Sequence, residues 1–457
     1  MFIFLCLYIA SFITALYRLF HKYQEGIFIF FICGLPIYIT SLSVANMYGL
    51  SNFIPFFQAF KEVIVLVALV AYTYRYNRKL RLQPIDWLLL LYVAYNFLYA
   101  LLPLGPYSLM ERLIALKGIS FFPFIYFAGR FCDPRQINLN KWFQYLCLLA
   151  IVTGIVLLFE IIPYKHLQTY TGYADFNASF FNVDPAGNYG LTWTFESING
   201  IKRFASFYSM PLEHAAATLV SISVIAALAT DKQNRVRLNT FLLVSFLFTL
   251  LSIAFAFSRA AFASYFLMIY VYMLITNNRL WLKMIHLSIL LVIIAVLVWL
   301  KGDIYEVITT TIDFSDSSSV SHLIEWVAGL QAIGSNPLGL GLGHSGRIAG
   351  SFGENIGGEN QLIIIGVQTG IVSMLLYITI YASIVKNAFK LFRRSKINKE
   401  RKIGLSLVLV KIGMIIPLLT AEAEAYLYIS YLVWFLSGML ISIIASKAGD
   451  TKTMLTL

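Results

Sequence analysis

Long apolar segments recur along the whole chain and decide what it can fold into. Segments of about 17–25 residues follow one another from end to end, and each can cross the hydrocarbon core of a bilayer as an α-helix. Only 12% of the 457 residues are charged, whereas soluble proteins carry roughly 25%. We therefore predict an all-α integral membrane protein that forms a single polytopic domain over residues 1–457.

The hydropathy pattern predicts about 12–13 transmembrane helices. The first begins at Met1 without a basic region or a small-residue cleavage site, so we expect a retained helix and not a signal peptide. Pro36 and Pro123 fall inside spans, where membrane helices tolerate proline. The thirteen predicted spans are Phe2–Tyr17, Gly26–Val44, Phe53–Tyr74, Ile85–Leu104, Arg112–Phe131, Trp142–Ile162, Pro211–Thr230, Leu238–Phe257, Ala260–Thr276, Lys283–Leu300, Gln361–Val385, Gly404–Leu419 and Ala425–Ser446.

The distribution of Lys and Arg predicts the orientation of these spans. Of the 34 basic residues, 24 lie in one set of alternating loops, seven lie in the other set, and three lie within spans. Cytoplasmic loops are enriched in Lys and Arg, so we expect the N-terminus outside and the C-terminus in the cytoplasm. The net charge of +12 then reflects orientation and gives no reason to expect nucleic acid as a partner.

Two long segments lie on the predicted outer side, residues 163–210 and residues 301–360. Loops of this length are usually functional. Aromatic residues beside Asn and Asp in the first loop suit sugar rings, although an aromatic belt at the membrane surface is the alternative. These aromatic residues are Tyr164, Tyr170, Tyr173, Phe176, Tyr189 and Trp193.

No cofactor or metal site is expected. The glycine-rich segment Gly339–Gly346 lacks the strand-to-helix context and the Lys-Ser/Thr ending of a phosphate loop, so we expect a flexible turn. The cysteines and the six histidines show no metal-ligand spacing. None of the cysteines lies in an outer loop, which excludes a disulfide framework there; they are Cys6, Cys33, Cys132 and Cys147.

Charged residues gather near the predicted outer face. Two membrane crossings separate Arg203 from Arg259, so both return to the same side, where Glu359 also lies. Placing an arginine near the boundary of the lipid acyl chains costs free energy unless the side chain has a partner. The planar guanidinium offers a fork of hydrogen-bond donors that matches phosphate oxygens. Two arginines could hold a diphosphate without a metal. Lys117 is a further candidate as an intramembrane cation, with pairing to Glu62 or Glu160 as the structural alternative.

Four motifs resemble one family of membrane enzymes. RFASFYSMPLEHAAATL, FSRAAF, SSSVSHLIEWVAGLQAIGSNPLGLGLG and GENQLIIIGVQTGIVS occur in that order between residues 202 and 373. They are similar to the two arginine motifs, the large outer loop and the His-Asn motif of the O-antigen ligase and O-antigen polymerase superfamily. The resemblance implies a GT-C-like fold in the bacterial cytoplasmic membrane and a metal-independent inverting glycosyltransferase without a cofactor.

The resemblance also implies the partners and the roles of site residues. The donor would be a glycan on a polyprenyl diphosphate, the acceptor another sugar, and a chain-length regulator a further partner. Arg203, Arg259 and Lys117 would bind the diphosphate. Glu359 would orient or deprotonate the acceptor hydroxyl with help from Asn360, and His322 and His344 are further candidates for the base. Capping of the following helix is the alternative role for Glu359.

Two departures from the family pattern favour one activity over another. The ligases carry His where this chain has Glu359, and the large-loop motif often has Arg where this chain has His322. Polymerase-like relatives vary more at the first position, so we expect a polymerase of lipid-linked repeat units. The alternatives are a ligase that transfers glycan to a lipid A core or another surface acceptor, and a transporter of lipid-linked sugars, which the lack of an internal repeat disfavours.

Overall fold

The computed structural model describes residues 1–75, 81–197, 200–277, 279, 282–284, 286–287, 317–347, 349–352 and 355–454. Within these residues the regular secondary structure is helical, apart from two isolated β-bridges. Ten of the helical segments described are long and apolar enough to cross a membrane, and a bent pair gives an eleventh. The protein is therefore all-α and has the make-up of a multi-pass membrane protein, as the apolar segments predict.

Twelve of the thirteen predicted spans coincide with described helices, and most of the thirteenth, Lys283–Leu300, lies outside the described residues. The α-helices are α1 (Ile3–Phe20), α2 (Ile27–Ile29), α3 (Tyr38–Met47), α4 (Ile54–Tyr74), α5 (Pro84–Leu101), α6 (Leu109–Ser120), α7 (Phe122–Phe131), α8 (Leu139–Ile161), α9 (Tyr173–Phe181), α10 (Pro211–Ala229), α11 (Thr240–Ala256), α12 (Arg259–Thr276), α15 (Ser317–Ser335), α16 (Ala349–Phe352), α17 (Gln361–Arg394), α18 (Asn398–Gly413), α19 (Ile415–Thr420) and α20 (Leu427–Met454).

Both prolines within spans mark irregular helix. Pro123 is near the start of α7, which meets α6 at a bend of 49°. Pro36 lies in a 3₁₀ turn, Leu35–Ile37, that follows a π-helical turn at Phe30–Gly34. Proline removes one backbone donor, and neighbouring helices can accommodate such breaks inside a membrane protein.

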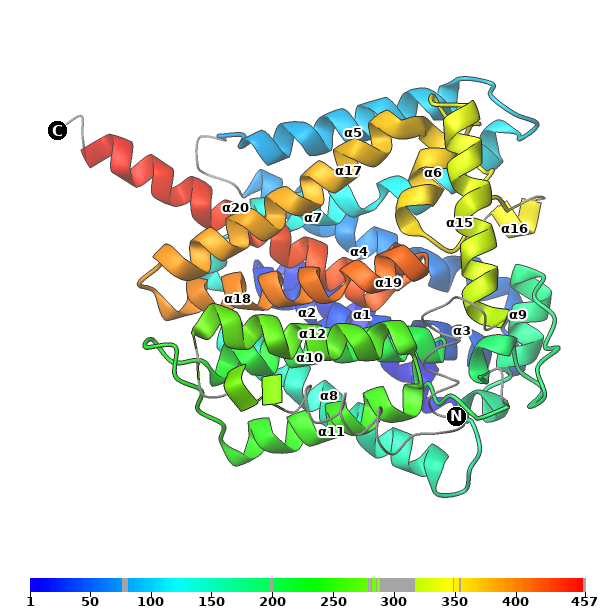
Figure 1. Ribbon diagram of the computed structural model, residues 1–457, viewed down its shortest axis with the longest axis horizontal. Helices are drawn as coiled ribbons and strands as arrows, with labels where there is room; N and C mark the ends of the chain where they lie inside the picture. Colours follow the sequence, from blue (N-terminus) through cyan, green and yellow to red (C-terminus); the bar gives the residue numbers. More distant parts are fainter. Residues whose placement is uncertain are drawn as a thin grey trace.

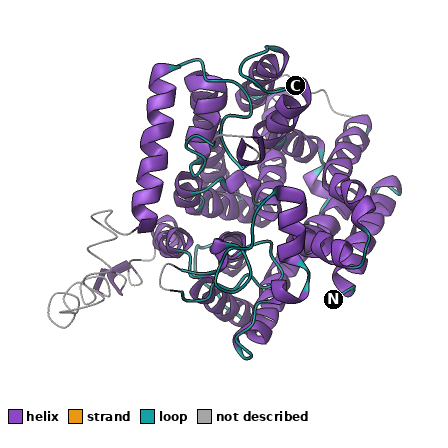
Figure 2. Ribbon diagram, turned by 90° about the vertical axis from the view of Figure 1, so that its right-hand side faces the viewer, coloured by secondary structure: helices purple, strands orange, loops and turns teal. Residues whose placement is uncertain are grey.

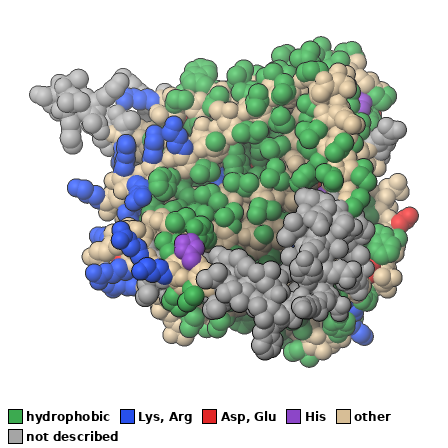
Figure 3. Space-filling model, in the orientation of Figure 1, with side chains coloured by type: hydrophobic (Ala, Val, Ile, Leu, Met, Phe, Trp, Pro, Cys, Tyr) green, Lys and Arg blue, Asp and Glu red, His purple; other side chains and the backbone are tan. Residues whose placement is uncertain are grey.

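The helices form a bundle with two chemically different ends. Figure 1 shows most helices side by side along the long axis, with α10 and α20 among the most deeply buried. Lys and Arg gather at the end where α17 finishes and α18 begins, on the left in Figure 3; we call it the basic end. The opposite end carries α9, α15 and α16, from the two long loops, and we call it the loop end. Figure 2 views the molecule from that end.

Helix α17 is broken near the loop end, and the glycine-rich segment fills the break. Thr369 and Gly370 have non-helical backbone angles within this 34-residue helix. The freed carbonyls of Val367 and Gln368 accept hydrogen bonds from the backbone N–H groups of Leu340 (2.7 Å) and Gly341 (3.0 Å). Gly339–Gly346 was expected to be a flexible turn, but part of it is bound along α17 because broken membrane helices need new partners for their backbone groups.

Helix α15 lies across the loop end of the bundle instead of running along it (Figure 1). Its inner face packs on the first turns of α17, where Ile333 contacts Ile363 and Val367. Its carboxylate Glu325 accepts a hydrogen bond from the backbone N–H of Gly358 (3.2 Å). These contacts fix the second long loop over the site described below.

Candidate functional site

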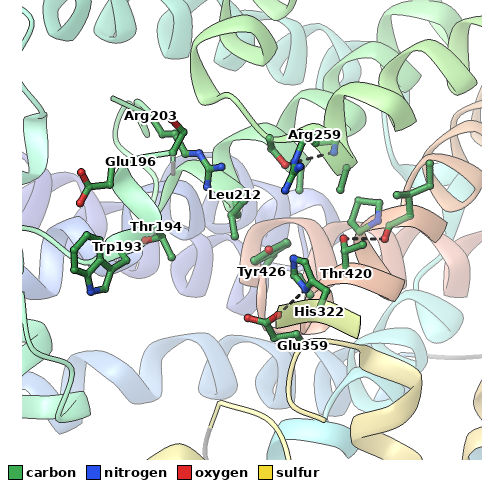
Figure 4. Close-up of a pocket in the computed structure, with 18 of the residues that line it drawn as sticks. Trp193, Thr194, Glu196, Arg203, Leu212, Arg259, His322, Glu359, Thr420 and Tyr426 are labelled. Atoms are coloured by element: carbon green, nitrogen blue, oxygen red, sulfur yellow. Dashed lines mark hydrogen bonds and ion pairs between the residues drawn. The ribbon is translucent and has the colours of Figure 1, made fainter. Parts of the chain in front are cut away.

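A cavity of about 640 Å³ opens at the loop end. Four separate stretches of chain line it: the first long loop with the start of α10, the α11–α12 turn, the second long loop, and α19 with the turn to α20. Its acidic, basic and histidine lining residues are Glu196, Arg203, Arg259, His322 and Glu359. Figure 4 shows both arginines on one side of the cavity, with His322 and Glu359 facing them.

Arg203 is held in place by the backbone on both sides of it. Its own N–H donates to the carbonyl of Phe195 (2.8 Å), and the N–H of Phe204 donates to Phe255 at the end of α11 (3.0 Å). The carbonyl of Phe204 accepts a hydrogen bond from Nδ1 of the buried His214, on α10 (2.9 Å). The guanidinium is therefore carried on fixed backbone, although the sequence places it in a loop.

Arg259 is the first residue of α12. Helix α11 ends with Phe257 in a left-handed conformation (φ 50°), and Ser258 caps α12 by accepting from the N–H of Ala261 (3.4 Å). Ala260 and Ala261 line the cavity beside Arg259. The cavity thus faces the N-terminus of α12, whose free N–H groups and partial positive charge favour an anion.

The two arginines create a strongly positive wall. Burial, together with the positive charge of Arg259, lowers the pKa of Arg203. Within the described part of the chain, the buried Nε of Arg203 has no hydrogen-bond partner. Two like charges at one cavity wall repel each other, so an anionic ligand between them would be strongly favoured.

Glu359 faces His322 and makes an ion-pair contact with it. The Oε2 atom of Glu359 lies 2.5 Å from Nδ1 of His322, and the second ring nitrogen points away from Glu359 toward the arginine side of the cavity (Figure 4). One turn farther along α15, Trp326 also lines the cavity. A carboxylate that holds one nitrogen of an imidazole leaves the other nitrogen available to exchange a proton.

Asn360, not Glu359, caps α17. Its side-chain Oδ1 accepts from the N–H groups of Leu362 (2.9 Å) and Ile363 (3.2 Å), and only 5% of the residue is exposed. The adjacent amide thus takes the capping role that was the alternative for Glu359. Asn360 was expected to help hold the acceptor or sugar, but it supports the helix and does not line the cavity.

The α19–α20 turn supplies a wall that sequence analysis missed. Thr420, Ala421 and Tyr426 line the cavity. The turn is tied to α17, because the N–H of Glu424 donates to the side chain of Gln361 (3.2 Å). The pair of carboxylates at 422 and 424, placed between two apolar spans, was the available signal.

Two expected site residues lie elsewhere. Lys117 was expected at the diphosphate, but it does not line the cavity and pairs with Glu62 (3.1 Å), and its side chain is 52% exposed. This is the structural alternative considered for it. His344 packs against Tyr107, with Nδ1 3.1 Å from the carbonyl of Gly341, and is also absent from the cavity wall.

The first long loop contributes fewer aromatic side chains than expected. Of its six candidate aromatics only Trp193 lines the cavity, while Tyr173 and Phe176 are buried in the protein. Asn188, Thr194 and Glu196 line it as well and were not expected. Among the described residues, no three His, Cys, Asp or Glu side chains are grouped so that they could hold a metal ion.

The cavity therefore combines paired guanidiniums, a carboxylate–imidazole pair and an aromatic-polar wall. Such a set can hold an anion at one side and exchange a proton at the other. No known protein-family model matches the chain, and no curated protein matches it significantly.

Proposed function

We propose that the protein is a membrane glycosyltransferase that joins polyprenyl-diphosphate-linked repeat units into a polysaccharide. The observation that carries this proposal is the placing of Arg203 and Arg259 on one wall of a cavity whose opposite wall holds His322 and Glu359. The motifs that resemble the O-antigen polymerase and ligase superfamily supply both walls.

The arginines are proposed to bind the diphosphate of the donor lipid. In glycosyl transfer the bond between the anomeric carbon and the diphosphate oxygen breaks, and that oxygen leaves with the electron pair. Fixed guanidiniums stabilise this developing charge because they are oriented before the reaction begins. The N-terminus of α12 adds to the same stabilisation.

The His322–Glu359 pair is proposed to handle the acceptor proton. The acceptor hydroxyl oxygen bonds to the anomeric carbon, and its proton passes to the nitrogen of His322 that faces the cavity. Glu359 holds the other nitrogen and stabilises the imidazolium that forms. Because the pair faces the arginines, attack comes from the side opposite the leaving group, which inverts the anomeric centre.

A second cavity supports a lipid donor. It has a volume of about 670 Å³ and is lined mainly by apolar side chains of α12, α17, α18 and α19. Leu418 and Leu419 line this groove, while Pro417 and Thr420, on the same short helix, line the charged cavity. A diphosphate between the arginines can thus extend its polyprenyl chain along the groove.

The orientation follows from the positive-inside rule. We assign the basic end to the cytoplasm and the loop end to the outer face of the bacterial cytoplasmic membrane. The charged cavity then opens where lipid-linked repeat units are available after export. A transporter reading is less favoured because the charges of the cavity gather at one end and not along a path.

Deletion of the protein tests this function through the length of surface glycan. A polymerase loss leaves single repeat units attached to their final carrier. Long chains stranded on polyprenyl diphosphate would instead identify a ligase. An unchanged length distribution and unchanged attachment would refute both activities.

A further inference from the structure

One wall of the cavity has no part in the chemistry proposed above. Trp193, Thr194 and Glu196 lie together on it, to one side of the line from the arginines to His322 and Glu359 (Figure 4). Asn188 completes this wall. This wall brings an indole, a hydroxyl, an amide and a carboxylate together.

The wall is fixed by contacts within the first long loop. The carboxylate of Glu196 accepts from both the backbone N–H and the side-chain amide of Asn188, each at 2.8 Å, and Glu196 is 6% exposed. Phe195 is buried in a small core with Tyr173, Leu191 and Ala205. Trp193, two residues before Phe195, stays 60% exposed on the cavity side.

An exposed indole beside a fixed carboxylate suits an uncharged sugar. The C–H face of a pyranose packs on an aromatic face, and its hydroxyl groups donate to carboxylate oxygens, which keep free lone pairs after the two Asn188 bonds. A carboxylate would repel a uronic acid or another anionic sugar. The chemical class expected at this wall is therefore a neutral sugar or an amino sugar.

We propose that Trp193 and Glu196 form a sugar subsite for the part of the donor glycan beyond its first sugar. This inference rests on the proposed function. The first sugar must lie between the arginines and His322, because the leaving diphosphate and the attacking hydroxyl are on opposite sides of its anomeric carbon. The remaining sugars then extend sideways, and Trp193 lies on that side (Figure 4).

The test compares two donors with the purified full-length protein. One is the lipid-linked repeat unit extracted from cells that lack the protein, and the other is the same lipid trimmed to its first sugar. For Trp193→Ala and Glu196→Gln, we expect the KM for the full donor to rise about tenfold, equivalent to about 1.4 kcal/mol, while the KM and kcat for the trimmed donor stay at wild-type values. Trp87→Ala is the matched control, because Trp87 is 61% exposed on α5 and does not line the cavity.

Binding of the soluble repeat-unit oligosaccharide, measured by saturation-transfer NMR, separates the subsite from the reaction. We expect wild type and Arg203→Ala to bind it, and Trp193→Ala to bind it about tenfold more weakly. Binding without product from any lipid-linked donor would support the subsite and refute the proposed function. Three outcomes would overturn the subsite. The variants could lose activity equally on both donors, both variants could keep wild-type kinetics, or the wild-type protein could fail to bind the oligosaccharide. Thermal unfolding confirms that each variant is folded, and Trp193→Phe, which keeps an aromatic face, should rescue part of the binding.

Discussion

Replacing Gly370 with alanine tests whether the break in α17 is built by close packing. Gly370 has φ 81° and ψ 175°, a region that essentially only glycine occupies. An added Cβ would lie 2.6 Å from the carbonyl oxygen of Pro337 and 2.7 Å from the carbonyl carbon of Leu338. Both neighbours are backbone atoms, so neither can move aside without shifting the glycine-rich segment.

The expected loss of stability has two parts. The strained backbone costs about 1–3 kcal/mol, and crowding in a packed region costs about another 1–3 kcal/mol. We therefore expect Gly370→Ala to lower the free energy of unfolding by about 2–6 kcal/mol, as measured by denaturant unfolding of the protein in detergent. Glycosyl transfer should fall as well, because the shifted segment is bound to the part of α17 that Asn360 caps.

Two other glycines separate the two parts of this cost. Gly49 also has a positive φ of 76°, but a Cβ there would meet open space, whereas Gly334 has open space and no positive φ. Gly49→Ala should show only the backbone cost. Gly334→Ala should be neutral or stabilising by up to about 1 kcal/mol, since alanine favours the α15 helix. If Gly370→Ala were no more destabilising than Gly49→Ala, the packing argument would be wrong.

Three further predictions concern single side chains. Arg259→Lys keeps the charge but loses the planar fork of donors, so we expect a substantial loss of glycosyl transfer with normal expression. Full activity of this variant would show that Arg259 only contacts lipid headgroups. Glu359→Gln should slow turnover about 10²–10⁴-fold at unchanged donor affinity. Its thermal stability should stay nearly unchanged, because Asn360 caps α17. Wild-type turnover in this variant would show that Glu359 takes no part in the chemistry. Burial, and secondarily Lys202, lowers the pKa of His166 to about 4 from 6.5, so the unfolded chain binds this proton more readily. The free energy of unfolding should then fall by up to about 3 kcal/mol between pH 6.5 and pH 4, and an equally steep fall in His166→Phe would contradict this assignment.

The sequence predicted the helices well because the bilayer imposes their length. Apolar segments with basic residues at alternate ends predict spans whatever the tertiary contacts are. The same logic predicted that Arg203 and Arg259 return to one side, since two crossings separate them, and the structure brings both to one cavity. Their binding to diphosphate stays a prediction.

The contacts within the site could not be predicted in the same way. His322 and Glu359 belong to one long loop, and they meet because α15 lies across the bundle and packs on α17. No local pattern encodes that crossing. Lys117 was interpreted as an intramembrane cation, whereas its pairing with Glu62 depends on how the bent pair α6–α7 is placed against α4.

The most direct test of the central claim is transfer by the purified protein in liposomes that contain the lipid-linked repeat unit. We predict products that remain on the lipid and lengthen by whole repeat units, with one polyprenyl diphosphate released for each new glycosidic bond. Arg203→Ala and Arg259→Ala should abolish both signals while the protein remains folded. Folded wild-type protein that forms no glycosidic bond and releases no polyprenyl diphosphate would contradict the account.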